Sequence, residues 1–155
     1  MTFSAWHSHG GDAPISIPAI GLDLWVRLPV SASGGTLAVI ETINAPGFGP
    51  PLHRHAETEV FRVLEGRYLY ELDGRRFHAE AGDVVSVPGG AAHAFINVTD
   101  APARQLVMIL PGLDAAAFFT ELGAVMQGGI PDRAALNRFG EKWGVTFLGP
   151  PLRTA

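Results

Sequence analysis

The sequence predicts an all-β barrel or sandwich followed by two short helices. Between about residues 22 and 110, short runs of apolar, β-branched and aromatic residues alternate with Gly, Pro, Asp and Asn. Eight such runs at this spacing are typical of a barrel or a sandwich. In chain order they are LDLWVRLPV, TLAVIETI, TEVFRVL, RYLYEL, RRFHAEA, DVVSVP, HAFINV and RQLVMIL. The segment YELDGRRF gives the sharpest hairpin signal, because Asp73 and Gly74 suit the positive φ angles of a two-residue turn.

A helical tail is predicted over 113–155. Two segments, LDAAAFFTELGAVM and PDRAALNRFGEKWG, place apolar residues at helical spacing behind Asp114 and Pro131 respectively. These apolar residues are Phe118, Leu122 and Met126 in the first segment, and Leu136, Phe139 and Trp143 in the second. We expect both helices to pack on the outside of the barrel rather than to form a lid over a pocket.

Length and composition favour one globular domain. The 155 residues are enough to bury a single core, and the net charge of −4 comes without a basic cluster that could follow nucleic acid or an anionic membrane surface. The N-terminal residues lack the pattern of a secretory signal, and no run of eighteen apolar residues occurs. These features predict a cytoplasmic protein that binds neither nucleic acid nor membrane.

The segment GFGPPLHRHAETEVFRVLEG, residues 47–66, carries a candidate metal site. The sequence has no cysteine, so a metal could be held only by His and carboxylate groups. On a strand, His53 and His55 project from the same face with Cα atoms about 7 Å apart. Glu59 lies about 13 Å further along an extended chain, too far to share an ion. A turn within HAETE is therefore predicted, after which Glu59 begins an antiparallel strand with its carboxylate beside the imidazoles.

His93 is the fourth candidate ligand, because it begins the strand HAFINV after the turn segment VPGGAA. Three imidazoles and one carboxylate suit iron, manganese, nickel, cobalt, copper or zinc, whereas calcium and magnesium prefer more oxygen ligands.

At these residues the sequence resembles the cupin superfamily. The first cupin motif, G-x5-H-x-H-x3-E-x6-G, spans 47–66, and the second, G-x5-P-x-G-x2-H-x3-N, spans 82–97. Their fixed positions are all met, by Gly47, His53, His55, Glu59 and Gly66 in the first and by Gly82, Pro88, Gly90, His93 and Asn97 in the second. The spacing between the motifs and the tail KWGVTFLGPPL look like those of bacterial quercetin dioxygenase-like single-domain cupins.

This resemblance implies that residues 1–155 form one double-stranded β-helix, or jelly roll, with a metal inside the barrel. The implied ligands are His53, His55, Glu59 and His93, and the divalent metal would be one of the six transition metals named above. Family members commonly form homodimers through a sheet edge and the N-terminal segment. The likeness therefore also implies a homodimer.

The leading hypothesis for function is a metal-dependent dioxygenase that acts on a small enol, diketone or flavonol-like aromatic substrate. Glu59 would also serve as general base if one of its oxygens leaves the metal, because its carboxylate would lie within reach of a bound hydroxyl. If Glu59 and His93 point inward, strand parity brings Phe61, Val63 and Phe95 to the same face, where they would form the substrate pocket.

Two other classes of function stay open. One is a non-enzymatic cupin that binds or senses a small molecule. The other is a metal-dependent isomerase or lyase, which would need a basic pocket residue for a phosphate-bearing substrate. Arg54 and Arg62 have the wrong parity for that role, and Arg104 is the one that stays possible.

Three further polar positions are given structural interpretations. The pair His7 and His9 repeats the spacing of two but is predicted to be solvated near the terminus. His78 is expected at the surface. Asn97 is expected to bond a turn or the backbone.

Overall fold

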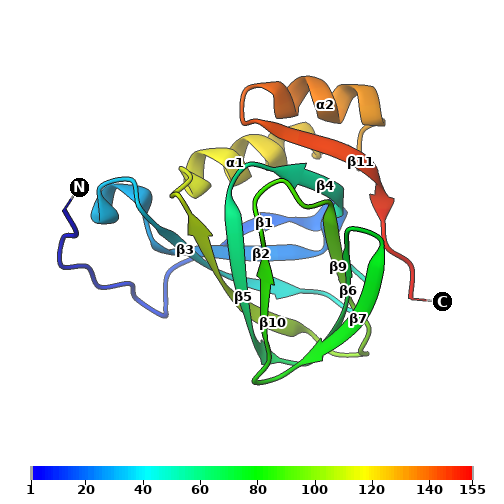
Figure 1. Ribbon diagram of the computed structural model, residues 1–155, viewed down its shortest axis with the longest axis horizontal. Helices are drawn as coiled ribbons and strands as arrows, with labels where there is room; N and C mark the ends of the chain where they lie inside the picture. Colours follow the sequence, from blue (N-terminus) through cyan, green and yellow to red (C-terminus); the bar gives the residue numbers. More distant parts are fainter. Residues whose placement is uncertain (1, 155) are drawn as a thin grey trace.

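Two antiparallel β-sheets face each other and enclose the core (Figure 1). The computed structural model describes residues 2–154. Across the first sheet the strands are β1 (Ile15–Ile17), β2 (Leu22–Leu28), β3 (Ala38–Asn44), β10 (Ala103–Leu110), β5 (Thr58–Glu65) and β8 (Val84–Val87). Across the second they are β11 (Val145–Pro151), β4 (Pro51–His55), β9 (His93–Asn97), β6 (Arg67–Leu72) and β7 (Arg75–Glu80). The predicted jelly-roll barrel is confirmed.

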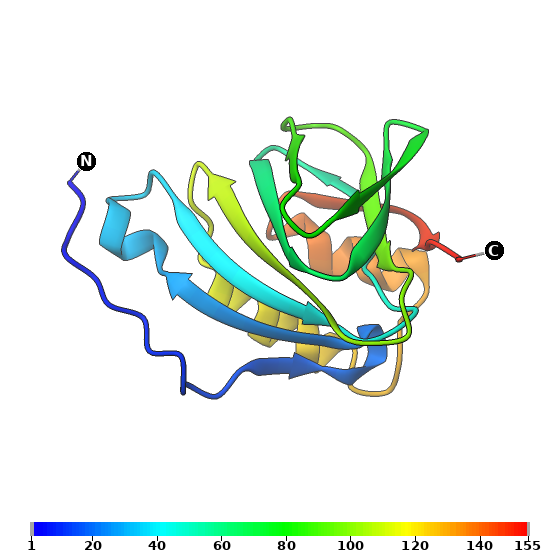
Figure 2. The ribbon, with the colours of Figure 1, turned by 90° about the horizontal axis from the view of Figure 1, so that it is seen from below.

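The chain crosses repeatedly between the sheets, as Figure 2 shows from below. It passes from β4 in the second sheet to β5 in the first, returns for β6 and β7, crosses to β8, returns for β9 and ends the barrel with β10. All eight predicted runs form strands. The short β1 and the edge strand β11 were not predicted, since β11 contains Gly149 and two prolines, which are tolerated at a sheet edge but do not signal a strand.

The hairpin between β6 and β7 has the predicted turn. Leu72 pairs with Arg75, and the two residues between them have φ angles of 47° at Asp73 and 81° at Gly74. Both angles lie in the left-handed region that a tight two-residue turn requires.

Inward-facing residues of β3 and β10 change character along the barrel. Toward one end they are apolar, with Ile40 and Val107 buried side by side in register. Toward the other end they are polar, because Thr42 and Gln105 are also register partners and also buried. The core is therefore apolar over most of its length and polar at one end.

The described residues also form four helical segments: the 3-10 helices η1 (Pro18–Ile20) and η2 (Val30–Ser33), and the α-helices α1 (Ala115–Val125) and α2 (Arg133–Glu141). The Asp114 side chain caps α1 as predicted, accepting a hydrogen bond from the Ala117 amide. Helix α2 begins behind Pro131 as predicted, and its cap is Asp132, whose side chain accepts a hydrogen bond from the Ala135 amide. Within residues 2–154 no helix is long and apolar enough to cross a membrane.

The α-helices α1 and α2 lie on one side of the barrel (Figure 1). Helix α2 packs on β11, where the Asn137 side chain exchanges two hydrogen bonds with the backbone of Phe147. Helix α1 packs against β1 and buries Phe118 and Leu122. Both of these α1 side chains also line the central cavity. The expectation that both helices lie outside the barrel, away from the pocket, is therefore wrong for α1.

Candidate metal centre

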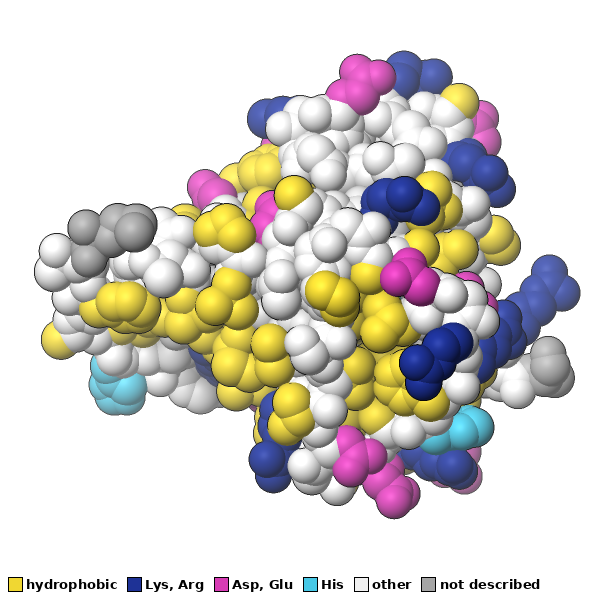
Figure 3. Space-filling model, in the orientation of Figure 1, with side chains coloured by type: hydrophobic (Ala, Val, Ile, Leu, Met, Phe, Trp, Pro, Cys, Tyr) yellow, Lys and Arg dark blue, Asp and Glu magenta, His cyan; other side chains and the backbone are white. Residues whose placement is uncertain are grey.

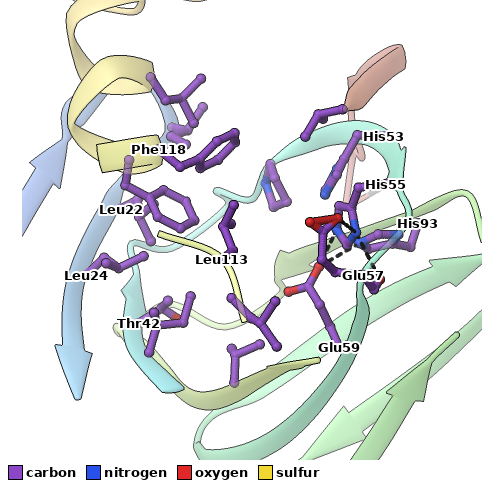
Figure 4. A pocket seen from close by; sticks show the side chains of 18 of the residues that line it. Leu22, Leu24, Thr42, His53, His55, Glu57, Glu59, His93, Leu113 and Phe118 are labelled. Carbon is purple, nitrogen blue, oxygen red and sulfur yellow. Dashed lines mark hydrogen bonds and ion pairs between the residues drawn. The ribbon is translucent and has the colours of Figure 1, made fainter. Parts of the chain in front are cut away.

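The structure brings together the four predicted ligands. His53 on β4 pairs in register with His93 on β9, and His55 follows two residues later on β4. After a turn at Ala56 and Glu57 the chain enters the opposite sheet, and Glu59 approaches the imidazoles across the barrel (Figure 4). One ligand atom from each of the four side chains lies within 4.8 Å of every other.

Backbone carbonyls fix the orientation of all three imidazoles. The Nδ1 atom of His53 lies 2.7 Å from the Pro51 carbonyl, that of His55 3.0 Å from the Glu57 carbonyl, and that of His93 2.9 Å from the Ala91 carbonyl. A carbonyl can only accept, so each Nδ1 carries the proton. Each Nε2 then presents its lone pair, as in histidines that bind metal.

The position of Glu59 fits a cation at this point. Its Oε1 lies 2.6 Å from the Nε2 of His55 and 3.2 Å from the Nε2 of His93. Because the Nδ1 atoms of His55 and His93 carry the protons, their Nε2 atoms are unprotonated. Each Nε2 lone pair would then face the negatively charged Glu59 oxygen, which is repulsive. A positive charge is needed between them, either a further proton or a metal ion. The donor set suits a borderline transition metal, so the residues fit the metal that the sequence predicts.

The same electrostatics shift the pKa values of the ligands. Burial, reinforced by the neighbouring imidazoles, lowers the pKa of His53 to about 3. Burial also lowers the pKa of His55, but its hydrogen bond to Glu59 and the charge of Glu59 outweigh this and raise it above the ordinary value. Burial raises the pKa of Glu59, whereas hydrogen bonds from His55 and His93 hold it well below its usual range. Glu59 is therefore a carboxylate at neutral pH.

A glycine pair ties the two ligand-bearing turns together. The amide of Gly90 donates to the His55 carbonyl at 2.7 Å, and the amide of Gly89 donates to the Thr58 hydroxyl at 3.1 Å. A Cβ on Gly89 would lie 2.1 Å from the Ala56 carbonyl oxygen, so no other residue allows this approach. Gly90 belongs to the cupin motif, whereas the roles of Gly89 and Thr58 could not be read from the sequence.

The metal centre opens onto an apolar cavity, shown in Figure 4. The cavity offers about 110 Å³ to the centres of water molecules, enough for several waters or a small organic molecule. Of the predicted wall residues, Phe61 and Phe95 line it. Val63 is fully buried and does not line the cavity, because two residues further along β5 the chain lies within the closed core. The inclusion of Val63 in the pocket was therefore wrong.

Residues from outside the barrel motifs complete the cavity. Helix α1 contributes Phe118 and Phe119, and Glu57 adds a second carboxylate near the metal centre. No lysine or arginine is among the described residues that line it. Arg104, which the sequence left possible, points outward and pairs with Glu41 on the outer face of the sheet.

The other polar positions behave as predicted. His7 and His9 are exposed with ring centroids 4.4 Å apart, and His78 is exposed. Asn97 is buried, and its side-chain amide donates to the carbonyls of Asn44 and Ala101. On the face in Figure 3, Lys and Arg side chains are scattered among acidic ones and form no continuous basic patch among the described residues.

The fold and the site thus define a class of protein: jelly-roll barrels that hold three histidines and one glutamate at a common centre. The Cupin domain family matches residues 40–109. An RmlC-like cupin from Shewanella frigidimarina has a similar structure, with a TM-score of 0.61, 21% identity, and coverage of 72% of this chain and 96% of that one. The family model thus matches less than half of the chain, and the structural likeness shows a shared fold.

Two curated proteins are similar in sequence. Uncharacterized protein MJ1618 of Methanocaldococcus jannaschii is 31% identical over 75 residues, which are 48% of this chain and 60% of that protein. Polyketide synthase CurC of Streptomyces cyaneus is 33% identical over 89 residues, which are 57% of this chain and 56% of that protein. The matches thus span less than two thirds of either relative.

Proposed function

We propose that this protein is a metal-dependent dioxygenase that acts on a small, largely apolar molecule with an enol, 1,3-diketone or phenol group. One observation carries the proposal: the cluster of four potential metal ligands lies in the wall of an apolar, aromatic cavity. The described residues that line this cavity include no lysine or arginine. The centre would bind the oxygen end of the substrate and the cavity would enclose the rest.

The donor set supports an open metal site. Three neutral imidazoles and one carboxylate would hold a divalent ion with a net charge of about +1, which would attract an anionic oxygen of the substrate. When bound, the metal supplies a Lewis acid that attracts an enolate or phenolate oxygen. The protein holds the imidazoles in place through the carbonyls behind them, so the donors are oriented before the metal binds.

The charge of the cavity favours this class of substrate over anionic ones. A phosphate or a dicarboxylate would meet Glu57 and Glu59 with no arginine or lysine among the lining residues to offset them. An aromatic substrate instead has ring partners, since Phe61 and Phe95 face the cavity with ring centroids 5.5 Å apart. The isomerase reading with a phosphate-bearing substrate is correspondingly weakened.

Glu59 would take part in substrate binding. Its low pKa keeps it ionised, and its position beside two imidazoles places an acceptor oxygen where a substrate hydroxyl would enter the centre. It would orient the substrate by accepting a hydrogen bond from this hydroxyl.

Oxygen consumption tests the proposal. The protein loaded with iron, nickel, manganese or copper is supplied with 1-phenylbutane-1,3-dione, catechol or 3-hydroxyflavone in an oxygen electrode. We expect uptake with at least one pairing, and its loss in His55→Ala. Binding of these compounds without uptake for any metal would contradict the dioxygenase and favour a binding or sensing cupin.

A second candidate is a non-oxidative reaction on a polyketide chain that bears 1,3-diketones. It is favoured by the 33% identity to a protein named as a polyketide synthase. The same cavity and centre would hold the enolate, and the reaction would need no oxygen. Conversion of a diketone substrate under anaerobic conditions, with unchanged rate, would select this candidate over the dioxygenase.

A further inference from the structure

The cavity wall opposite the metal centre carries a polar side chain without a partner. Thr42 on β3 lines the cavity, and Figure 4 shows it across from the histidines, beyond Leu113. Its side chain is 95% buried, and its Oγ1 makes no hydrogen bond to any of residues 2–154. A buried hydroxyl without a partner is costly, which is why such groups are normally bonded.

The neighbouring strand adds a second orphan group. Gln105 on β10 is the register partner of Thr42 and is fully buried. Its Oε1 accepts a hydrogen bond from the Tyr70 hydroxyl, whose pKa burial raises well above the ordinary value, so that the phenol stays protonated. This bond fixes the amide orientation and leaves Nε2 without an acceptor. The polar end of the barrel interior therefore has unused hydrogen-bonding capacity on two adjacent strands.

The residues around Thr42 determine where a ligand can form a hydrogen bond on this wall. Leu24, its register partner on β2, and Ile40, two residues before it on β3, also line the cavity and are apolar. Asn44, two residues after Thr42, is a polar lining residue, but its Oδ1 already accepts from the Tyr68 hydroxyl. A ligand oxygen that reaches this wall therefore finds Thr42 as the polar contact whose hydroxyl has no partner among the described residues. Such isolated polar groups orient a ligand and give specificity.

We propose that Thr42 is a distal anchor for the substrate. The anchor binds a hydroxyl or carbonyl oxygen at the end of the molecule remote from the metal. The substrate class follows, on the basis of the proposed function: a molecule with a chelating enol or phenol at one end, an apolar or aromatic middle, and one further oxygen function at the other end.

The test uses binding rather than turnover. The probes are 1-phenylbutane-1,3-dione and its three analogues with one hydroxyl on the ring at the 2, 3 or 4 position, titrated into zinc-loaded protein by calorimetry. We expect one hydroxylated isomer to bind about 5- to 10-fold more tightly than the parent compound, the gain from a single buried hydrogen bond. Equal binding of all four probes would overturn the anchor.

Three variants locate the effect. Thr42→Val removes the hydroxyl while keeping the shape, and we expect it to abolish the preference without lowering the Tm. Thr42→Ser keeps a hydroxyl and should keep the preference. Trp143→Phe removes the other unpartnered buried polar atom of the cavity wall, the indole Nε1, and should also keep it. A preference that survives Thr42→Val, or that disappears in Trp143→Phe alone, would overturn the assignment to Thr42.

The outcomes separate the anchor from the proposed reaction. A hydroxyl preference that depends on Thr42, without oxygen uptake by any metal form, supports the anchor and rejects the dioxygenase. Oxygen uptake without the preference supports the dioxygenase and rejects the anchor. Failure of all four diketones to bind rejects the substrate class on which both depend.

Discussion

Two pairs of histidines in this chain have the same spacing and different surroundings. His7 and His9 lie near the N-terminus, exposed, with ring centroids 4.4 Å apart. His53 and His55 lie on β4, where the centroids are 5.5 Å apart and each Nδ1 is held by a backbone carbonyl. Ring proximity is therefore greater in the exposed pair, although only the second pair belongs to a cluster of four potential ligands within residues 2–154.

The difference shows what the barrel adds to a pair of imidazoles. Strand pairing supplies a third imidazole, that of His93, and the crossing to the opposite sheet supplies the Glu59 carboxylate. The carbonyls behind the rings fix the tautomers. Two histidines separated by one residue can bring their rings together. A metal site, however, needs further donors, which here come from β5 and β9 as well as β4.

Removal of one ligand should have the largest effect. His55→Ala deletes the imidazole closest to Glu59 and leaves a buried carboxylate with less compensation. We expect zinc affinity to fall at least about 100-fold, more than for loss of an outer-shell group. Metal content after dialysis, measured by mass spectrometry, checks this. The matched control is His9→Ala, which should keep one zinc per chain; equal losses in the two variants would contradict the account.

A methyl group at the glycine pair should have the next largest effect. Gly89→Ala places a Cβ 2.1 Å from the Ala56 carbonyl oxygen and pushes apart the turns that carry His55 and His93. We expect a loss of about 1–3 kcal/mol of unfolding free energy and weaker zinc binding. Chemical denaturation of the zinc-free protein measures the first.

The control for that change lies beside the exposed pair. A Cβ on Gly10 would have nothing within 4 Å, so Gly10→Ala should change stability by less than about 0.5 kcal/mol. A destabilised Gly10→Ala, or an unaffected Gly89→Ala, would show that the turn contact does not support the site.

The stabilisation by metal should rise with pH. A metal must displace the proton from His55, whose pKa is raised above its ordinary 6.5, whereas His53, with a pKa of about 3, is already neutral. Below the His55 pKa, zinc affinity should therefore fall about tenfold for each pH unit. Tm values with and without zinc between pH 5 and 8 measure the increment; an increment that is constant or that falls with pH would contradict this.

The metal-free protein should show the opposite trend near neutrality. The raised pKa of His55 gives stability that is fully present below 6.5 and is lost as pH rises through the folded pKa. The lowered pKa of Glu59 gives stability that is present above 4.5 and is lost as pH falls through the folded pKa. The pair therefore contributes most between these two values, where a proton on His55 opposes zinc binding.

The smallest effect is expected at the tether between the turns. Thr58→Val removes the hydroxyl that accepts from the Gly89 amide, which should cost about 1 kcal/mol of unfolding free energy. Thr58→Ser, which keeps the acceptor, should cost less. Equal costs for the two variants in chemical denaturation would show that the methyl group rather than the hydrogen bond matters.

The sequence was sufficient to group His53, His55 and Glu59 because the spacing of these three residues is local. Strand parity pairs His53 with His55, and the turn before Glu59 follows from the reach of an extended chain. The place of β5 in the opposite sheet did not follow, since sheet membership depends on long-range pairing. The motif likeness supplied what parity alone could not, the partnership of His93 with the first pair.

The cavity was less predictable because distant segments build it. Parity placed Phe61 and Val63 on one face, but parity does not say how deep along the barrel each residue lies, and only Phe61 reaches the cavity. The sequence also did not place helix α1 at the cavity. An apolar helix face can pack either on a sheet or over an opening, so the helical pattern alone does not distinguish the two. Thr42 gave no signal, since a threonine in a strand is ordinary.

Anomalous diffraction from zinc-loaded crystals tests the central claim most directly. The account predicts one strong peak inside the barrel, about 2.0–2.2 Å from the Nε2 atoms of His53, His55 and His93 and from an oxygen of Glu59. A barrel interior without a peak, or zinc bound at His7 and His9 instead, would contradict it.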